Sequence, residues 1–237
     1  MPVIAQPTID RPDALLVQEL GQYSAATIHE AQGRTGAVDS DIKPVSPSMS
    51  FCGPAFTVVA SAGDNLMLQL AIALANPGDV IIVSAGQYAE AGSFGDVLAN
   101  ACKAKGIAAM VTDSGVRDTE DLKELGFPTF SRSICMKGTV KETIAPFGQT
   151  ISFGGQIINP GDVVRGDADG IVVVKKDEVA RAISTSAARV AGEEADIARF
   201  WEGKDTIEIC GIADRLASKG YTLDEAILSA RGAGQLV

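Results

Sequence analysis

The stretch Gly92–Asp118, GSFGDVLANACKAKGIAAMVTDSGVRD, carries most of the information about the fold class of this chain. It opens on the glycine-rich Ser93-Phe94-Gly95-Asp96 and closes on the pair Arg117-Asp118. Between them lie a helix-like segment, 96–105, and the apolar run Ile107–Val111, which is typical of a buried strand. A helix followed by a strand brings both ends to one edge of a sheet. Backbone amides, an arginine and two carboxylates would meet there.

The flanking sequence extends this pattern into an α/β fold with parallel crossovers. Gly53–Ala60 reads as a strand, Leu66–Ala75 as a helix that begins after Gly63-Asp64-Asn65, and Val80–Val83 as a buried strand. The small-residue stretch Ala85–Gly95 is expected to be a loop. After the central stretch, residues 113–115 predict a turn, 119–125 a helix ended by a glycine, and 127–130 a strand.

The two ends of the chain differ from this centre. Residues 12–23 and the segment after Ser24 predict two helices, the second carrying His29 and Glu30. From Gly148 to Val174, short β-rich runs separated by turns predict antiparallel strands. An amphipathic helix is expected over 177–203. We therefore expect one domain over 1–237, with 177–237 as a helical C-terminal extension.

Composition narrows the classes of partner. The 237 residues carry 30 acidic and 20 basic side chains, a formal charge of −10, which disfavours nucleic acid or an anionic membrane as the main partner. The four cysteines are scattered, and a single histidine makes a zinc cluster improbable. No basic region with an apolar run opens the chain. A cytoplasmic protein with neutral thiols is expected.

The Arg117-Asp118 pair has a chemical and a structural interpretation. Asp118 suits Mg²⁺ or Mn²⁺, and Arg117 suits a carboxylate or an enolate oxygen, which together fit a 2-oxo acid. Alternatively, Arg117 contacts a helix C-terminus and Asp118 caps the next helix, within a plain turn–helix–strand–turn. His29 is likewise either catalytic or a hydrogen-bonded structural residue.

Five motifs together resemble a known family. They are AATIHEAQGR (Ala25–Arg34), GDNLM (Gly63–Met67), PGDVIIV (Pro77–Val83), FGDVLANACKAKGIAAMVTDSGVRD (Phe94–Asp118) and GDVVRGDADGIVVV (Gly161–Val174). Over Ala25–Val174 the chain is similar to the class II pyruvate aldolases acting on 4-hydroxy-4-methyl-2-oxoglutarate and 4-carboxy-4-hydroxy-2-oxoadipate. That superfamily also contains non-catalytic regulators of ribonuclease E activity.

The resemblance implies a role for each residue of the central stretch. Asp118 corresponds to the protein ligand of a divalent metal, Mg²⁺, Mn²⁺ or another cation. Arg117 corresponds to the group that contacts the substrate's keto or enolate oxygen. The backbone amides of Ser93, Phe94, Gly95 and Asp96 correspond to the cradle for the pyruvyl carboxylate. Asp96 also corresponds to a carboxylate that holds water and assists proton transfer.

The resemblance further implies that the site is shared between subunits. In the family, acidic groups of an adjacent subunit complete it, and Glu30 matches one of them. Glu193 or Glu194 of the long helix is the expected second. The implied fold is an αββα sandwich with a mixed sheet, a swivelling β/β/α-like core and a long C-terminal helix. The implied assembly is a homotrimer or homohexamer.

The function implied is a lyase that cleaves a 4-hydroxy-2-oxo acid to pyruvate and a second carbonyl compound. Oxaloacetate decarboxylation would be a side activity, and the degradation of aromatic compounds is the expected context. A protein-binding regulator is the alternative, and a dedicated decarboxylase is a third. The regulators lack the acidic ligand after the arginine, whereas Asp96 and Asp118 are both present here. Catalysis is therefore the favoured expectation.

Overall fold

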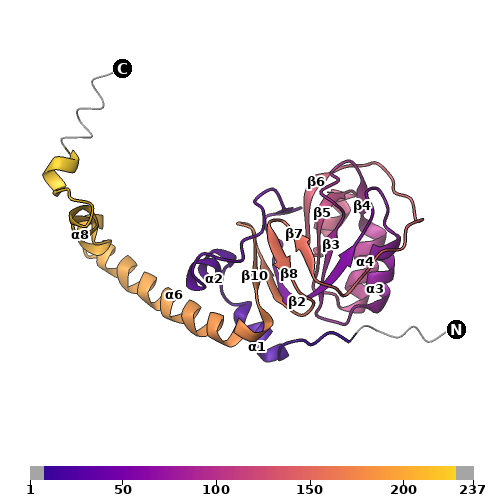
Figure 1. Ribbon diagram of the computed structural model, residues 1–237, viewed down its shortest axis with the longest axis horizontal. Coiled ribbons are helices and arrows are strands. Elements are labelled where there is room, and N and C mark those ends of the chain that lie inside the picture. The colour runs from indigo at the N-terminus through magenta and orange to yellow at the C-terminus, as the bar shows by residue number, and fades with distance from the viewer. Residues whose placement is uncertain (1–7, 228–237) are drawn as a thin grey trace, which may run out of the picture. The chain divides into compact units, whose positions relative to one another are not determined.

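The computed structural model describes residues 8–227, and the chain separates into two compact units between Ser186 and Ala187. The first unit is built on a mixed, eight-stranded sheet (Figure 1). Its strands follow the order β1-β6-β5-β3-β2-β9-β10, and β4 pairs with β5 beside this path. The expected α/β class with a mixed sheet and a long C-terminal helix is confirmed.

Parallel strands form the centre of the sheet. They are β2 (Phe51–Val59), β3 (Val80–Ser84), β5 (Ala109–Val116) and β6 (Thr129–Ile134), with the short β4 (Gly92–Phe94) parallel to β5. The helices α3 (Leu66–Leu74), α4 (Asp96–Lys105) and α5 (Thr119–Leu125) connect them. Parallel neighbours need such crossovers, and the alternation of predicted strands and helices is confirmed here.

Antiparallel pairs flank this centre, and those within 148–174 were predicted from the sequence. They involve β9 (Val163–Gly166) and β10 (Ile171–Val174) beside β2, β1 (Lys43–Pro44) beside β6, and a separate hairpin of β7 (Ile151–Phe153) and β8 (Gln156–Ile158). The turn between β9 and β10 is closed by the Asp167 N–H, which donates to the Gly170 carbonyl at 3.0 Å.

Alternating side chains of the strands divide the core between the two faces of the sheet. Phe56, Val58 and Met110 pack with α3, α4 and α5, whereas Ile82 and Val111 pack with the β7–β8 hairpin on the other face. Over β9 and β10, the helical face continues with α1 (Ala14–Leu20), α2 (Ala25–Ala31) and the start of α6 (Val179–Trp201). The sheet is thus covered by helices on one side and by the hairpin on the other.

The terminal helices begin where the sequence indicated. The Ser24 hydroxyl accepts the Thr27 N–H at 3.0 Å and caps α2. A short 3₁₀ turn, Lys176–Glu178, leads into α6, and the second unit adds α7 (Thr206–Ile209) and α8 (Ile212–Ala217). Within 8–227, no helix has the length and apolar character needed to cross a membrane.

The cysteines of the first unit are unpaired thiols. Burial raises the pKa of Cys52 and of Cys102 to about 12, so both are neutral at physiological pH.

Two local predictions were wrong. The segment Asp113–Gly115 is part of β5 and not a turn, and Gly92–Phe94 is a strand and not a loop. The Asp113 carboxylate accepts the N–H groups of Ala85 and Gln87, at 2.6 and 3.0 Å, so turn-forming residues here hold the neighbouring loop. Tertiary partners therefore override the local preference for a turn.

The sequence Asn-Pro-Gly-Asp-Val occurs twice and forms the same turn twice. Asp79 and Asp162 are each fully or almost fully buried, and each carboxylate accepts the N–H three residues earlier, at 2.8 and 2.9 Å. Asp79 also pairs with Arg11 at 2.7 Å, and Asp162 with Lys175 at 2.8 Å. Each turn leads into a strand, β3 or β9, so the repeated sequence has a structural role.

Candidate active site

The pairing of β4 with β5 brings the two ends of the central stretch together. Phe94 lies opposite Val116, and the Arg117 N–H donates to the Phe94 carbonyl at 2.9 Å. The residues that follow these strands, Gly95-Asp96 and Arg117-Asp118, are therefore neighbours at the carboxyl edge of the sheet. Ligand sites of open α/β sheets are found at this edge.

Gly95 allows Asp118 to approach the first turn of α4. A Cβ atom at Gly95 would lie 2.2 Å from Asp118 Oδ2, so only glycine leaves room for this carboxylate. Asp118 itself has a left-handed backbone, with φ 55° and ψ 44°, which is uncommon for a residue other than glycine. Its Oδ2 accepts the Asp96 N–H at 3.3 Å. Such backbone strain often occurs at functional sites.

The charged groups here are only loosely paired. Arg117 Nε lies 3.5 Å from Asp118 Oδ2, and the two side chains are 47% and 32% exposed. The Asp96 carboxylate has no hydrogen bond or ion pair with any residue in 8–227. Because none of these groups is fully satisfied by the protein, they remain able to bind a ligand.

A cavity of about 420 Å³ opens beside these groups. One wall comes from α3, where Asn65 donates to the Ser93 carbonyl at 3.0 Å and accepts from Gln69 at 3.0 Å. Another wall comes from the connection between β6 and β7. The residues that line the cavity are Asn65, Gln69, Gly92, Ser93, Gly95, Asp96, Val97, Leu98, Arg117, Asp118, Gly138, Thr139 and Lys141.

The predicted amide cradle, Ser93–Asp96, spans the end of β4 and the first residue of α4. Ser93 and Phe94 belong to β4, and their carbonyls accept from Asn65 and Arg117. Within α4, the Ala99 N–H is the first to bond to a helical carbonyl, that of Gly95. The N–H groups of the preceding first turn, including those of Val97 and Leu98, have no helical partner and lie at the positive end of the helix.

Sequence reasoning missed several wall residues: Asn65, Gln69, Val97, Leu98, Thr139 and Lys141. Asn65 lies in the GDNLM motif, which was a usable signal. Thr139 and Lys141 lie in a connection without periodicity, and only the fold brings that connection to the cavity.

The remaining predicted acids lie elsewhere. Glu30 is on α2, which packs against β10, and its carboxylate accepts from Arg34 Nε at 3.1 Å. Glu193 lies on the part of α6 that belongs to the second unit, where it pairs with Arg189 at 2.8 Å, and Glu194 is exposed on the same helix. The cavity beside Arg117 is lined only by residues of the first unit, and Glu30 is not among them. His29 bonds the Thr35 carbonyl through Nδ1 at 2.9 Å, as a structural histidine would.

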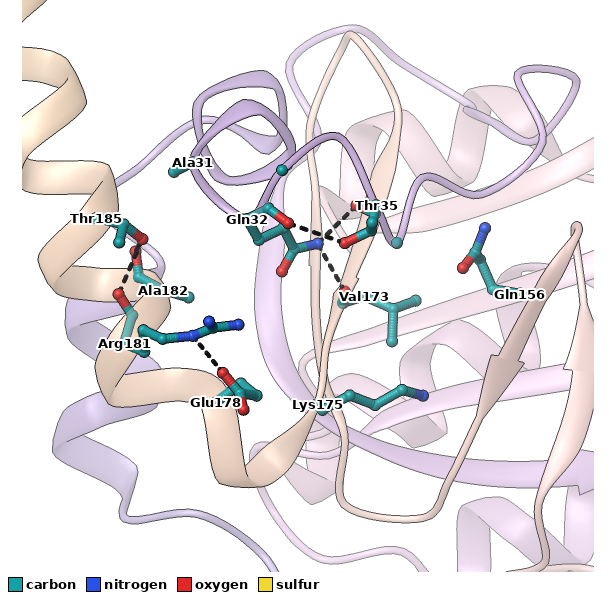
Figure 2. A pocket seen from close by; sticks show the side chains of 12 residues that line it. Ala31, Gln32, Thr35, Gln156, Val173, Lys175, Glu178, Arg181, Ala182 and Thr185 are labelled. Atoms are coloured by element: carbon teal, nitrogen blue, oxygen red, sulfur yellow. Dashed lines mark hydrogen bonds and ion pairs between the residues drawn. The ribbon is translucent and has the colours of Figure 1, made fainter.

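A second cavity, of about 430 Å³, lies between the end of α2, β10 and the start of α6 (Figure 2). Figure 2 shows the Gln32 amide nitrogen bonded to the carbonyls of Thr35 and Val173, at 2.7 and 3.1 Å. Its two cations are already paired: Arg181 Nε lies 2.5 Å from Glu178, and Lys175 bonds Asp162 at 2.8 Å. This cavity offers no uncompensated charge to an ionic substrate.

The fold and the edge cavity define an α/β protein in which the N-terminus of a helix lies beside an arginine and two carboxylates. Residues 20–173 match the RraA-like family model, described as aldolase/RraA, and the chain belongs to that family. A Halalkalibacterium halodurans protein, provisionally named 4-hydroxy-4-methyl-2-oxoglutarate aldolase, is 36% identical over 156 residues. The match covers 66% of this chain and 74% of that protein.

Solved structures have the same fold. Streptomyces coelicolor RraAS2, described as an unusual member of the RNase ES inhibitor RraA family, aligns with a TM-score of 0.69 and 28% identity. That alignment covers 80% of this chain and all of RraAS2. An uncharacterized Pseudomonas syringae protein aligns with a TM-score of 0.72 and 22% identity, over 84% of this chain and 98% of that protein. The family therefore includes proteins named as aldolases and as regulators.

Proposed function

We propose that this protein is a divalent-metal-dependent lyase that cleaves a 4-hydroxy-2-oxo acid to pyruvate and a second carbonyl compound. One observation carries the proposal. The first turn of α4, the Arg117 guanidinium and the carboxylates of Asp96 and Asp118 line one cavity at the carboxyl edge of β4 and β5. The name of the Halalkalibacterium relative supports the same chemistry.

The substrate's pyruvyl carboxylate would be bound by the start of α4. The N–H groups of Val97 and Leu98, at the positive end of a ten-residue helix, are suitable donors for an anion. Arg117, which is permanently charged, would donate to the 2-keto oxygen and stabilise negative charge that develops there as the C3–C4 bond breaks. Binding the two oxygens at adjacent points would fix the orientation of the bond to be cleaved.

The donor set at this edge fits a hard divalent cation. Asp118 and Asp96 present carboxylate oxygens, which Mg²⁺ and Mn²⁺ prefer. Within 8–227, no group of three or more acidic, histidine or cysteine residues could hold a metal ion. As the family resemblance implies, Asp118 would be the protein ligand, and water and substrate oxygens would complete the shell. When bound, the cation would polarise the 2-oxo group as a Lewis acid.

Proton transfer is assigned to the acidic groups. A base must take the proton of the C4 hydroxyl, and the C3 carbon of pyruvate must receive one afterwards. Asp96, which lines the cavity and whose carboxylate has no protein partner in 8–227, would hold water for the second step. Glu30, with Glu193 or Glu194, would reach the site from an adjacent subunit of a homotrimer or homohexamer.

The decisive experiment measures pyruvate release from 4-hydroxy-4-methyl-2-oxoglutarate with added Mg²⁺ or Mn²⁺. We expect turnover that is lost on chelation and restored by the metal, and a parallel decarboxylation of oxaloacetate through the same enolate. Asp118→Ala should abolish both reactions while the protein stays folded. Turnover that survives both chelation and Asp118→Ala would refute the proposed mechanism.

A regulator that binds a ribonuclease E-type nuclease or an associated helicase is the second candidate. The alignment with RraAS2 over its whole length favours it. Purified nuclease or helicase binding to this chain, together with no turnover and no heat of metal binding in calorimetry, would support the regulator and exclude the lyase.

A further inference from the structure

The Asp64 carboxylate lies at a junction beside the candidate site, where it is only 4% exposed. Its Oδ1 accepts the Leu66 N–H at 2.8 Å. Its Oδ2 accepts two further N–H groups, those of Glu142 and Thr143, also at 2.8 Å. A single buried side chain therefore joins the start of α3 to the connection between β6 and β7.

Both segments that Asp64 joins contribute to the cavity. The α3 side provides Asn65 and Gln69, and the connection provides Gly138, Thr139 and Lys141. In Figure 1 this connection runs along the side of the sheet that carries α3 and α4. We call residues 137–143 the strap.

The strap is held by backbone bonds at two further points. The Gly92 N–H donates to the Lys137 carbonyl at 2.8 Å. Val140 donates to the Gly63 carbonyl at 2.9 Å and accepts the Asn65 N–H at 3.1 Å. The residues that face the cavity therefore lie between anchors, and Asp64 secures the far end.

Hydrophobic packing contributes little to holding the strap. Met136 is 89% exposed, Val140 56% and Ile144 84%, so these three apolar side chains do not reach the core, and the nearest ones that pack against it, Ala145 and Phe147, follow the strap. Without buried apolar surface, the position of the strap depends on its hydrogen bonds, and the bonds to a buried carboxylate are the strongest kind available.

We propose that Asp64 is a positioning residue that fixes the strap and thereby determines how the site binds the part of the substrate beyond its pyruvyl unit. This inference rests on the proposed lyase function. The pyruvyl end would be held by α4 and Arg117, whose geometry comes from the β4–β5 pairing. The strap, with Thr139 and Lys141, forms a separate wall of the cavity, and the bonds that Asp64 makes to it are not part of that pairing.

The test compares Asp64→Ser with Asp162→Ser. A serine at 64 has one oxygen, which can keep the short bond to the Leu66 N–H but leaves Glu142 and Thr143 without an acceptor. Asp162 is a matched control, because it is equally buried and its carboxylate accepts from Asn159, Lys175 and Lys176, away from the cavity. Comparing the two variants separates a general loss of stability, which both should show, from an effect on the strap, which only Asp64→Ser should show.

Two reactions separate the two ends of the substrate. Cleavage of 4-hydroxy-4-methyl-2-oxoglutarate uses the whole cavity, whereas exchange of the pyruvate methyl protons with deuterium uses only the pyruvyl end. For Asp64→Ser we expect KM for cleavage to rise about tenfold, as for the loss of one or two hydrogen bonds, while kcat and the exchange rate change less than about threefold. Asp162→Ser should leave the ratio of the two reactions unchanged.

Amide hydrogen exchange provides a readout that does not require activity. Asp64→Ser should speed exchange in the strap selectively, and Asp162→Ser should not. Equal losses of cleavage and of pyruvate exchange, or a strap that exchanges as slowly as in the wild type, would overturn the inference. If the wild-type protein catalyses neither reaction, the lyase proposal and the specificity role both fall, and hydrogen exchange alone then decides whether Asp64 holds the strap.

Discussion

The cavities beside Arg117 and Arg181 differ less in volume than in how their charged side chains are paired. The cavity beside Arg117 and the one beside Arg181 hold about 420 and 430 Å³, and polar side chains line both. Beside Arg181, each cation has a carboxylate partner at 2.5 or 2.8 Å. Beside Arg117, the one ion pair is stretched to 3.5 Å, and no carboxylate of 8–227 lies within 4.0 Å of Lys141.

This difference in ion pairing indicates that the cavity beside Arg117 is the better candidate for binding a charged substrate. Charges that are satisfied by neighbours stabilise the fold, whereas charges left without good partners keep their capacity to bind a charged ligand. The cavity beside Arg117 also contains the left-handed backbone of Asp118, which is strained, and the close approach of Asp118 to Gly95. Cavity volume alone would not have separated the two sites.

The largest effect is expected from removing the guanidinium. Arg117→Ala should lower kcat for cleavage about 10²- to 10³-fold, as losing one transition-state donor does elsewhere. Arg181→Ala is the matched control, because it removes an arginine of the same exposed kind from the other cavity. Steady-state kinetics measure kcat for both variants. Similar losses of kcat in the two would contradict the assignment of the reaction to the cavity beside Arg117.

Gly95→Ala should have the next largest effect. The new methyl group would lie 2.2 Å from Asp118 Oδ2, so the carboxylate must move away from α4. We expect kcat/KM to fall about tenfold to a hundredfold because small misplacements at a reacting centre are costly. Calorimetric titration with Mn²⁺ should show weaker binding, and a variant with wild-type affinity and kinetics would contradict the assigned geometry.

The sequence predicted the fold well where local signals were strong. The helix 96–105 and the glycine stop after 119–125 were found because glycines and periodicity mark them clearly. The strand at Gly92–Phe94 and the extension of β5 through Asp113 were missed, because both depend on partners distant in the chain. Parallel pairing leaves no local signature comparable to a helix cap.

The candidate site was predictable only in part for the same reason. Arg117, Asp118 and Asp96 were identified from one continuous stretch, and the structure brings them to one cavity. The strap was not predictable from the sequence, because it is bonded at Glu142 and Thr143 to Asp64, which lies 78 and 79 positions earlier in the chain. The roles of Glu30, Glu193 and Glu194 remain predictions, since they require a neighbouring subunit.

Substituting Lys141 should have a smaller effect and tests the comparison of the two cavities further. It lies on the strap, lines the cavity and has no carboxylate partner in 8–227, so it is suited to the distal carboxylate of a dicarboxylic substrate. Lys141→Ala should raise KM for 4-hydroxy-4-methyl-2-oxoglutarate about tenfold, the size expected for one hydrogen bond to a charged group, with kcat nearly unchanged. Lys175→Ala, in the other cavity, should leave KM as it is. A loss in kcat instead would place Lys141 at the reacting end.

The smallest effect concerns acid stability and the strap. Burial acts to raise the pKa of Asp64, but its hydrogen bonds to Leu66, Glu142 and Thr143 outweigh this, and the pKa is lowered. A lowered pKa means that the ionised group stabilises the fold at pH values above the ordinary pKa of about 3.9. This contribution disappears as the pH falls through the lowered pKa.

The Asp64→Asn variant has no carboxyl group at this position and therefore no such titration. Urea unfolding from neutral to acidic pH should therefore show the wild type losing its advantage over Asp64→Asn below about pH 4. A difference in unfolding free energy that stays constant or widens on acidification would show that the charge of Asp64 does not stabilise the fold.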